Sequence, residues 1–368
     1  MTNNPGTRVG VIVSHPIQYF SPLFDLLNER GRMDLRVLYG NDAGLRPQLD
    51  PGFNVEYQWD LDLVSKHDHD FATRGDGASL RELLRGVVST FRFVKSRDEF
   101  VIHGWVGALT VAAIAACWLL RKPYWLRSDT SARRHYRQWD PREFWPRLVY
   151  RRSRGALAAG QRNAAMAIRL GAPSAPVAPF AVDNARFARA ARHPQPRDAP
   201  AVVFAGKFIP AKRPGDVLDA AKRLPAVKFL MVGGGPLDFE LRTVAENLPN
   251  VTFGGFKNQT EMPAALATAD VVLLPSEYEP WGLIVNEAMA CGLVPVVSDA
   301  VGCAPDLVTG LGQTFPTGNI HALCGAIEAG LATAGARGTG VRLWERVEQF
   351  SLDACALAYE SALTGRQG

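Results

Sequence analysis

Two glutamates in the C-terminal half of the chain have a type and spacing that suit the binding of hydroxyl groups, and they flank a helix start that suits phosphate. Glu279 lies in an acidic loop after the apolar run 271–275, and Glu287 lies eight residues later, in a helix expected to begin near Gly282. Carboxylates accept hydrogen bonds from paired hydroxyl groups and oppose a developing positive charge. The first backbone N–H groups of the helix, at Gly282 and Leu283, suit an anion such as a diphosphate. We therefore expect these groups to face one cleft.

Short apolar runs alternate with segments of helical period along the chain, and these elements must position the glutamates. The alternation is typical of βαβ units with a parallel sheet. It restarts after the proline-rich stretches 173–179 and 193–196, which predicts two open α/β sheets that bind ligands at the carboxyl ends of their strands. The expected strands are 9–13, 35–38, 100–103, 201–205, 228–232, 251–253, 271–275 and 294–298. The expected helices are about 22–30, 104–120, 214–223, 238–246, 261–267 and 352–363.

Length and composition fit this organisation. The chain has 368 residues, which at roughly 100–200 residues per domain suggests two domains, with a boundary near 182–200. Its content of 47% hydrophobic and 21% charged residues is close to globular averages and excludes a disordered or fibrous chain.

The cysteines and the N-terminus indicate a reducing, cytoplasmic setting. The five cysteines are widely spaced and form no C-x-x-C pair, which argues against a disulfide framework or a structural zinc site. No long apolar segment precedes a small-residue cleavage site near Met1, so we expect no secretory signal. The uncharged run 104–120 has 17 residues, fewer than the roughly 20 that cross a bilayer, and is expected to form a buried helix.

Basic residues are concentrated in one part of the N-terminal half. Between Arg121 and Arg169 there are 13 lysines and arginines against three acidic residues. This balance suits an anionic partner, either a lipid headgroup surface or a phosphorylated substrate, and equally a solvated helix face. The segment 133–154 also contains Trp139, Phe144, Trp145 and Tyr150, which suits peripheral association with the inner face of a membrane. We expect no nucleic-acid partner.

The stretch 275–292, with Glu279 and Glu287 inside a strand, loop and helix frame that ends in Ala290-Cys291-Gly292, resembles the E-x7-E signature of retaining glycosyltransferases of family four. The resemblance implies an α/β GT-B fold, with two Rossmann-like doubly wound domains facing across a cleft. It implies an acceptor-binding domain over 1–182, a nucleotide-sugar-binding domain over 183–348, and a C-terminal helix over 349–368 that crosses back to the first domain.

The resemblance also assigns roles in the second domain. Glu279 would contact the hydroxyl groups of the donor sugar and support charge at the anomeric carbon, and Glu287 would bind the ribose. The loop 206–214 is similar to the family's G-R-x-x-x-x-K loop, with Lys207 where arginine is usual and Lys212 matching. Both lysines would neutralise the leaving diphosphate. Together with the Gly282 and Leu283 amides they imply a metal-independent reaction, and no D-x-D motif follows an expected strand.

Three further segments carry weaker resemblances. Phe256 and Lys257 lie in a loop similar to the one that contacts the nucleotide base. The stretch 14–24 resembles a subgroup with the motif H-P-I-Q-Y-x-x-P-L-F, which would point His15 and Gln18 into the cleft. The segment 179–187 resembles the family's interdomain crossover.

Three residues at expected strand ends complete the predicted acceptor side. His103 and Arg127 end two strands and are expected to line the cleft. Asp129 stands near the position where many family members have histidine, and it would act as a general base, orient the donor sugar, or pair with Arg127.

These expectations describe a metal-independent, retaining hexosyltransferase without a cofactor. Its co-substrate would be a nucleotide-diphosphate sugar, a UDP-sugar by family frequency and a GDP-sugar second. The acceptor would be a glycan, a lipid-linked molecule or a small molecule, in polysaccharide, envelope glycan or glycosylated-metabolite biosynthesis. A GT-B-fold nucleotide-sugar epimerase and a non-catalytic nucleotide-sugar-binding protein remain alternatives.

Overall fold

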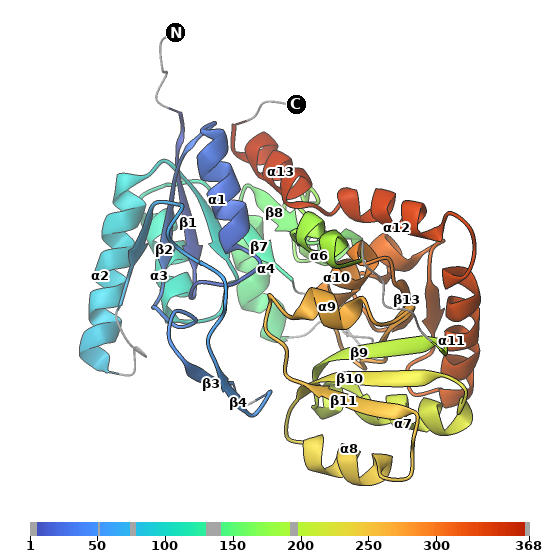
Figure 1. The fold of residues 1–368 in the computed structure, drawn as a ribbon. Coiled ribbons are helices and arrows are strands. Elements are labelled where there is room, and N and C mark those ends of the chain that lie inside the picture. Colours follow the sequence, from blue (N-terminus) through green and yellow to red (C-terminus); the bar gives the residue numbers. More distant parts are fainter. Residues whose placement is uncertain (1–5, 51, 74–78, 130–140, 192–197, 365–368) are drawn as a thin grey trace. The chain divides into compact units, whose positions relative to one another are not determined.

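The computed structural model describes residues 6–50, 52–73, 79–129, 141–191 and 198–364. The chain divides into two compact units, each built around a parallel β-sheet with helices packed on it (Figure 1). Unit 1 comprises Met1–Gln48, Leu61–Ala181 and Leu352–Gly368, and unit 2 comprises Leu49–Asp60 and Val182–Ser351. The predicted α/β class with two parallel sheets is confirmed.

Unit 1 has a six-stranded parallel sheet in the order β5-β2-β1-β6-β7-β8. The central strand β1 is almost entirely apolar and buried, and it pairs with β2 and β6 on its two sides, as expected for a parallel sheet covered on both faces. The strands are β1 (Arg8–Val13), β2 (Asp34–Tyr39), β5 (His69–Phe71), β6 (Glu99–His103), β7 (Tyr124–Ser128) and β8 (Gly155–Ala158). The helices are α1 (Ser21–Arg30), α2 (Leu80–Ser96), α3 (Ala108–Leu119), α4 (Phe144–Arg151), α5 (Gln161–Arg169) and α13 (Leu352–Thr364).

The helices of unit 1 follow local sequence signals. Pro22 stands in the first turn of α1, and the helix ends at Gly31, whose φ of 60° suits a residue without a side chain. The uncharged run 104–120 forms α3, which has 12 residues and buries Ala113, Ile114 and Cys117. Among the described helices none is both long and apolar enough to cross a membrane.

Unit 2 has a second six-stranded parallel sheet, in the order β11-β10-β9-β12-β13-β14, and the two-stranded sheet β3-β4. The six strands are β9 (Ala201–Lys207), β10 (Lys228–Gly234), β11 (Val251–Gly255), β12 (Val271–Leu274), β13 (Val294–Ser298) and β14 (Gln313–Phe315), and the hairpin strands are β3 (Gln48–Asp50) and β4 (Val55–Tyr57). The helices are α6 (Asn184–Ala191), α7 (Pro214–Arg223), α8 (Asp238–Ala245), α9 (Met262–Leu266), α10 (Leu283–Ala290), α11 (Ile320–Ala334) and α12 (Thr339–Glu348).

The strand order of unit 2 brings several predicted loops to one edge. β9 lies between β10 and β12, so the loops that follow these three parallel strands leave at neighbouring positions. The ends of β9 and β10 approach so closely that a Cβ on Gly233 would lie 1.9 Å from the carbonyl oxygen of Gly206. Only glycine fits this contact.

One segment of unit 2 comes from early in the chain. The chain passes from unit 1 to unit 2 at Val182 and returns at Leu352. The short hairpin within Leu49–Asp60 belongs to unit 2, although it lies in the predicted first domain. Its strands have three residues each and give no clear periodic signal.

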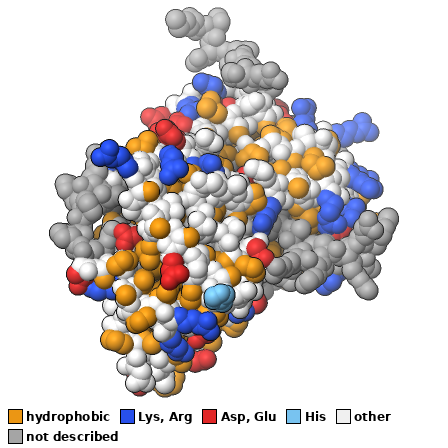
Figure 2. Space-filling model, turned by 90° about the vertical axis from the view of Figure 1, so that its right-hand side faces the viewer, with side chains coloured by type: hydrophobic (Ala, Val, Ile, Leu, Met, Phe, Trp, Pro, Cys, Tyr) orange, Lys and Arg blue, Asp and Glu red, His pale blue; other side chains and the backbone are white. Residues whose placement is uncertain are grey.

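Surface side chains on the side where α11 and α12 lie are mixed in type. Figure 2 shows lysines and arginines, acidic residues and hydrophobic residues interspersed there. Such mixing is ordinary for a protein surface.

Candidate functional site

The loops after β9 and β12 meet at the edge of the unit 2 sheet. The backbone N–H of Glu277 donates to the carbonyl oxygen of Ala211 over 3.0 Å. Beside this contact, Lys212 Nζ forms an ion pair with Glu279 Oε2. The predicted glutamate and one predicted lysine are therefore in direct contact, on loops that belong to adjacent strands.

Hydrogen bonds from the backbone of the segment after β13 hold the backbone around Glu279. The carbonyl oxygens of Glu279 and Trp281 accept bonds of 2.8 and 2.9 Å from the N–H groups of Gly302 and Cys303. Gly282 then turns the chain into α10 with a φ of 101°, a conformation that favours glycine. This frame fixes the loop in which the Glu279 side chain is 12% exposed.

Glu287 lies in α10 and is partly buried. Burial raises the pKa of its carboxyl group to about 7, and the positive charge of Arg186 opposes this rise. Within the described part of the chain, the carboxylate has no hydrogen-bond or ion-pair partner. The guanidinium of Arg186 is fixed by bonds of 2.8 and 2.7 Å to Gln259 O and Oε1. Glu287 is thus an acceptor with its oxygens available, beside a fixed cation.

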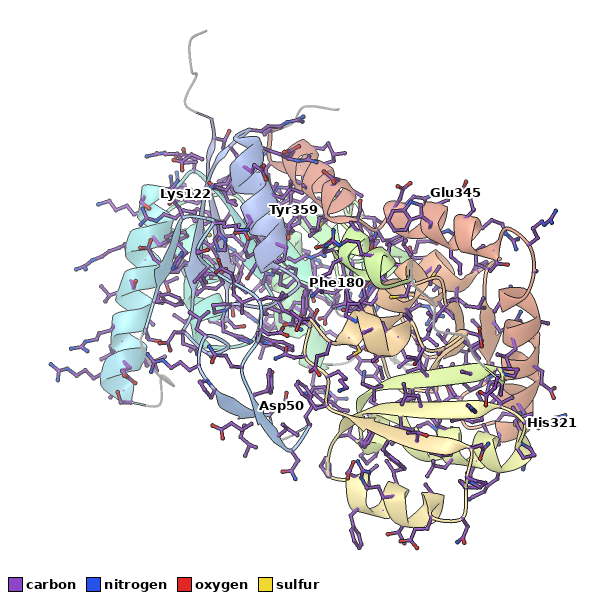
Figure 3. All side chains as sticks on the ribbon, in the orientation of Figure 1. Asp50, Lys122, Phe180, His321, Glu345 and Tyr359 are labelled. Carbon is purple, nitrogen blue, oxygen red and sulfur yellow. The ribbon has the colours of Figure 1, made fainter. Side chains whose placement is uncertain are left out.

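Lys207 contacts a carboxylate from the hairpin. Its Nζ donates to both oxygens of Asp50, at 2.9 and 2.8 Å, and lies 5.0 Å from the centre of the Phe53 ring. Asp50, labelled in Figure 3 at the hairpin, also accepts from the N–H groups of Gly52 and Phe53. Burial raises the pKa of Asp50, but the bonds from Lys207 and these amides outweigh it and hold the pKa below its usual value. The second predicted lysine therefore has a carboxylate partner too.

The hairpin also contacts the loop predicted to bind a base. The Phe256 ring lies 5.1 Å from that of Phe53 and 5.3 Å from that of Tyr57, between centroids. Asn258 Nδ2 donates to the carbonyl oxygen of Gln58 over 2.7 Å. The neighbouring predicted residue, Lys257, pairs instead with Glu261 at 3.2 Å. Phe53 and Tyr57 of the hairpin and Phe256 of the loop after β11 thus form an aromatic cluster beside Lys207.

The predicted residues of the first half all lie in unit 1. His103 ends β6, and its ring packs edge-on against Phe20 at 4.4 Å between centroids. Burial and the charge of Arg127 hold the pKa of His103 well below its usual value. Both ring nitrogens are buried and have no hydrogen-bond partner among the described residues. His103 therefore lies against the rings of Phe20 and Phe24, in surroundings that favour its neutral form.

Arg127 lies in the interior of unit 1, at 2% exposure. Its Nη1 donates to the carbonyl oxygens of Leu157 and Ala178, and its guanidinium carbon lies 4.6 Å from the centre of the Phe180 ring. Arg127 and Asp129, both described, form no ion pair, so that alternative for Asp129 is not what the structure shows. The contact of Arg127 with an acceptor stays a prediction.

The other predicted residues of unit 1 are more accessible. Asp129 is exposed, and its carbonyl oxygen accepts from Asn163 Nδ2 over 2.8 Å. Burial and the charge of Asp129 raise the pKa of Tyr19 to about 12. His15 Nδ1 lies 2.9 Å from Ser14 Oγ, and Gln18 is partly buried. Residues 133–140 of the predicted basic segment lie outside the described residues.

Sequence reasoning missed the hairpin residues of this site and the part played by Arg186. Asp50 precedes Pro51-Gly52, a typical turn sequence, but nothing in the sequence connects that turn with Lys207, 157 positions away. Arg186 lies in the segment that resembles the interdomain crossover, and its charge beside Glu287 appears only in the fold.

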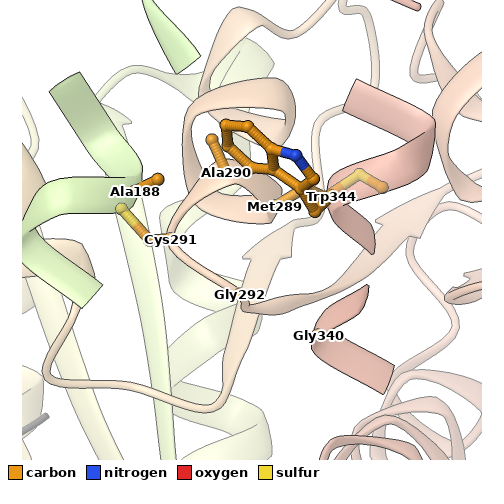
Figure 4. Close-up of a pocket in the computed structure, with 7 residues that line it drawn as sticks. All are labelled: Ala188, Met289, Ala290, Cys291, Gly292, Gly340 and Trp344. Atoms are coloured by element: carbon orange, nitrogen blue, oxygen red, sulfur yellow. The ribbon is translucent and has the colours of Figure 1, made fainter. Parts of the chain in front are cut away.

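A cavity of about 340 Å³ lies elsewhere on unit 2 (Figure 4). None of its lining residues is a predicted site residue. The cavity is lined by Ala188, Met289, Ala290, Cys291, Gly292, Gly340 and Trp344.

Within the described residues no group of three histidine, cysteine or acidic side chains could hold a metal ion.

Residues 186–333 match the family model described as glycosyl transferases group 1. The match includes both glutamates and both lysines of the site. The chain therefore contains a group 1 glycosyl transferase domain. The D-inositol 3-phosphate glycosyltransferase of Mycobacterium leprae (strain Br4923) is 39% identical over 144 residues, which cover 36% of this chain and 33% of that protein. The matched part thus spans about a third of such relatives.

Solved structures resemble nearly the whole chain. Sucrose-phosphate synthase from Thermosynechococcus elongatus has a TM-score of 0.70 and 20% identity, covering 96% of this chain and 97% of that one. Anabaena Alr3699/HepE in complex with UDP has a TM-score of 0.73 and 16% identity, covering 98% and 100%. At such identities the likeness shows the fold alone, which is that of GT-B glycosyltransferases with two Rossmann-like domains, as the sequence predicted.

Proposed function

We propose that this chain, with its group 1 glycosyl transferase domain, is a retaining glycosyltransferase that moves a hexose-type sugar from a nucleotide-diphosphate sugar to an acceptor hydroxyl. The observation that carries the proposal is the contact of Lys212 with Glu279 at the sheet edge of the matched domain. A cation and a carboxylate at one point suit a ligand that carries both an anionic diphosphate and sugar hydroxyl groups.

Each side chain then has a defined task. Lys207 and Lys212 stabilise negative charge on the departing diphosphate, assisted by the N–H groups of Gly282 and Leu283 at the start of α10. Glu279 accepts bonds from donor-sugar hydroxyl groups and opposes positive charge at the anomeric carbon. Glu287, whose carboxylate has no hydrogen-bond or ion-pair partner among the described residues and lies beside the charge of Arg186, accepts from the ribose hydroxyl groups.

We assign UDP as the nucleotide. The structurally similar Anabaena Alr3699/HepE was solved with UDP, and the aromatic surface of Phe53, Tyr57 and Phe256 beside Lys207 suits a base next to a diphosphate. The similarity to the M. leprae enzyme covers only 36% of this chain, so the acceptor named for that enzyme is not transferred. Asp129, His103, His15 and Gln18 on unit 1 would serve the acceptor.

The reaction proposed here needs no metal, because two lysines and a helix N-terminus supply positive charge for the leaving group. Thermal-shift measurements with UDP, GDP and ADP in EDTA test both the nucleotide and this independence. UDP at about 100 times its dissociation constant should add roughly 2.7 kcal/mol of stability. Glu287→Ala should lose the shift, and Glu277→Ala, on the same loop as Glu279, should keep it.

Retention of the anomeric configuration can be tested without knowing the acceptor, because water slowly reacts with the donor in the acceptor's place. Proton NMR of UDP-α-glucose hydrolysis should show α-glucose before mutarotation if the sugar keeps its configuration. Early β-glucose would contradict retention, and an isomerised nucleotide sugar would favour an epimerase. If no nucleotide raises the melting temperature and UDP-α-glucose is not hydrolysed, the chain has a role other than sugar transfer.

A further inference from the structure

Helix α2 (Leu80–Ser96) of unit 1 exposes an apolar stripe. The helix packs on the unit with Gly86, Thr90, Phe93 and Val94. At about 100° per residue, its exposed apolar side chains begin at the edge of that buried face, where Leu83 lies, and continue over the adjoining sector. These are Leu80, Leu83, Leu84, Val87, Val88 and Phe91, with exposed fractions from 36% for Phe91 to 74% for Leu80.

The concentration of these side chains distinguishes α2 from the rest of the described surface. Seventeen large hydrophobic side chains are exposed in the described residues, and six lie on this helix. Scattered ones such as Val341 on α12 are ordinary. α3 packs beside α2 and exposes Val111 and Leu119 from a helix without a charged residue. A contiguous apolar surface of this kind marks an interaction site.

Positive charge runs along one margin of the stripe. Arg81, Arg85, Arg92 and Lys95 are all exposed. The three arginines occupy the sector next to the stripe, and Lys95 lies at its margin beside Val88. Long side chains with nitrogen ends extend outward from α2 in Figure 3. Glu82 is the single acidic residue of the helix. An apolar face bordered by cations is the arrangement of helices that lie in the interface of an anionic bilayer.

We propose that α2 docks unit 1 onto an anionic lipid surface. Its stripe would insert at the boundary between headgroups and acyl chains while the arginines and the lysine contact lipid phosphates. The helix has 17 residues and is thus about 26 Å long, long enough to lie along a planar surface. A bilayer suits this linear arrangement with a single charged margin. The proposal concerns other residues than those of the basic segment 133–154, and it does not depend on the proposed function.

Co-sedimentation of the full chain with vesicles tests the proposal. Wild type should bind phosphatidylcholine vesicles containing phosphatidylglycerol, bind pure phosphatidylcholine weakly, and dissociate as salt rises. Leu84→Glu with Val88→Glu should reduce binding at least tenfold, and Arg85→Gln with Arg92→Gln should weaken it and flatten its salt dependence. Val341→Glu, an exposed position in unit 2, is the matched control and should bind as wild type.

Three results would overturn the proposal. Wild type would fail to sediment with the anionic vesicles, or the α2 variants would bind as strongly as wild type. Alternatively, light scattering would show a dimer that Val88→Glu dissociates, which would make the stripe a contact between copies. Because all substituted side chains are exposed, equal melting temperatures across the variants would separate a loss of docking from a loss of folding.

Discussion

Two lysine–carboxylate pairs in unit 2 look alike and differ in where their acids come from. Glu279 reaches Lys212 from the loop after the adjacent strand, whereas Asp50 reaches Lys207 from the hairpin, far away in sequence. The Lys207 side chain is 34% exposed and that of Lys212 is 23% exposed. The loops after two adjacent strands therefore form the Lys212 pair, while the Lys207 pair depends on a separate segment of the chain.

The difference matters because neither pair is strong. Partly exposed ion pairs contribute about 0.2–1 kcal/mol to stability. A well-placed diphosphate forms stronger charge-assisted hydrogen bonds with the same cations. In the proposed reaction both lysines exchange a carboxylate for phosphate oxygens. After the exchange Glu279 remains inside the site and has sugar hydroxyl groups to accept from, whereas Asp50 has no such task.

The largest effect is expected at the pair built by the sheet. Glu279→Gln keeps the shape of the side chain but removes the charge that opposes the anomeric cation, so donor turnover should fall about 10²–10³-fold, with a small change in UDP affinity. UDP release from a UDP-sugar measures turnover. Glu277→Gln is the matched control, since Glu277 is 54% exposed and lies 3.9 Å from Arg213, and it should turn over as wild type. Equal losses in both variants would contradict the role of Glu279.

A second effect concerns Glu287, which belongs to neither pair. Its raised pKa, about 7, means that the folded protein keeps this proton between about pH 4.5 and 7 while the unfolded chain loses it, so its contribution to stability falls as pH rises through that window. Ribose hydroxyl groups need the ionised carboxylate as acceptor. UDP affinity should therefore fall below pH 7, by up to about tenfold per unit.

Calorimetric titration with UDP between pH 5.5 and 8.5 measures this dependence. The phosphate of UDP also titrates near pH 6, so Glu287→Gln is needed as the reference. That variant should bind UDP weakly and keep only the slope that belongs to UDP itself. The same slope in wild type and variant would remove Glu287 from the ribose site.

The sequence anticipated the Lys212 pair better than the Lys207 pair for a physical reason. Parallel strands leave at one edge, so the alternation of apolar runs together with the Glu279 motif places local loops near each other. Asp50 lies in a hairpin of two three-residue strands, whose position depends on side-chain packing against Phe256 and not on periodicity. Arg127 shows the same limit, since its place at the end of a strand does not reveal that its guanidinium is buried against Phe180.

The smallest predicted effect, a change in UDP affinity on substitution of Asp50, tests the difference between the Lys207 and Lys212 pairs most directly. Asp50→Asn removes the charge that competes for Lys207 while keeping an acceptor for the Gly52 and Phe53 amides. If diphosphate displaces Asp50, the variant should bind UDP about two- to fivefold tighter, as the loss of a partly exposed ion pair allows, and uridine, which lacks phosphate, should bind unchanged. Glu56→Gln, at an exposed position on β4 of the same hairpin, is the control. Weaker UDP binding in Asp50→Asn would show instead that Asp50 positions Lys207 for the ligand, and the two pairs would then act alike.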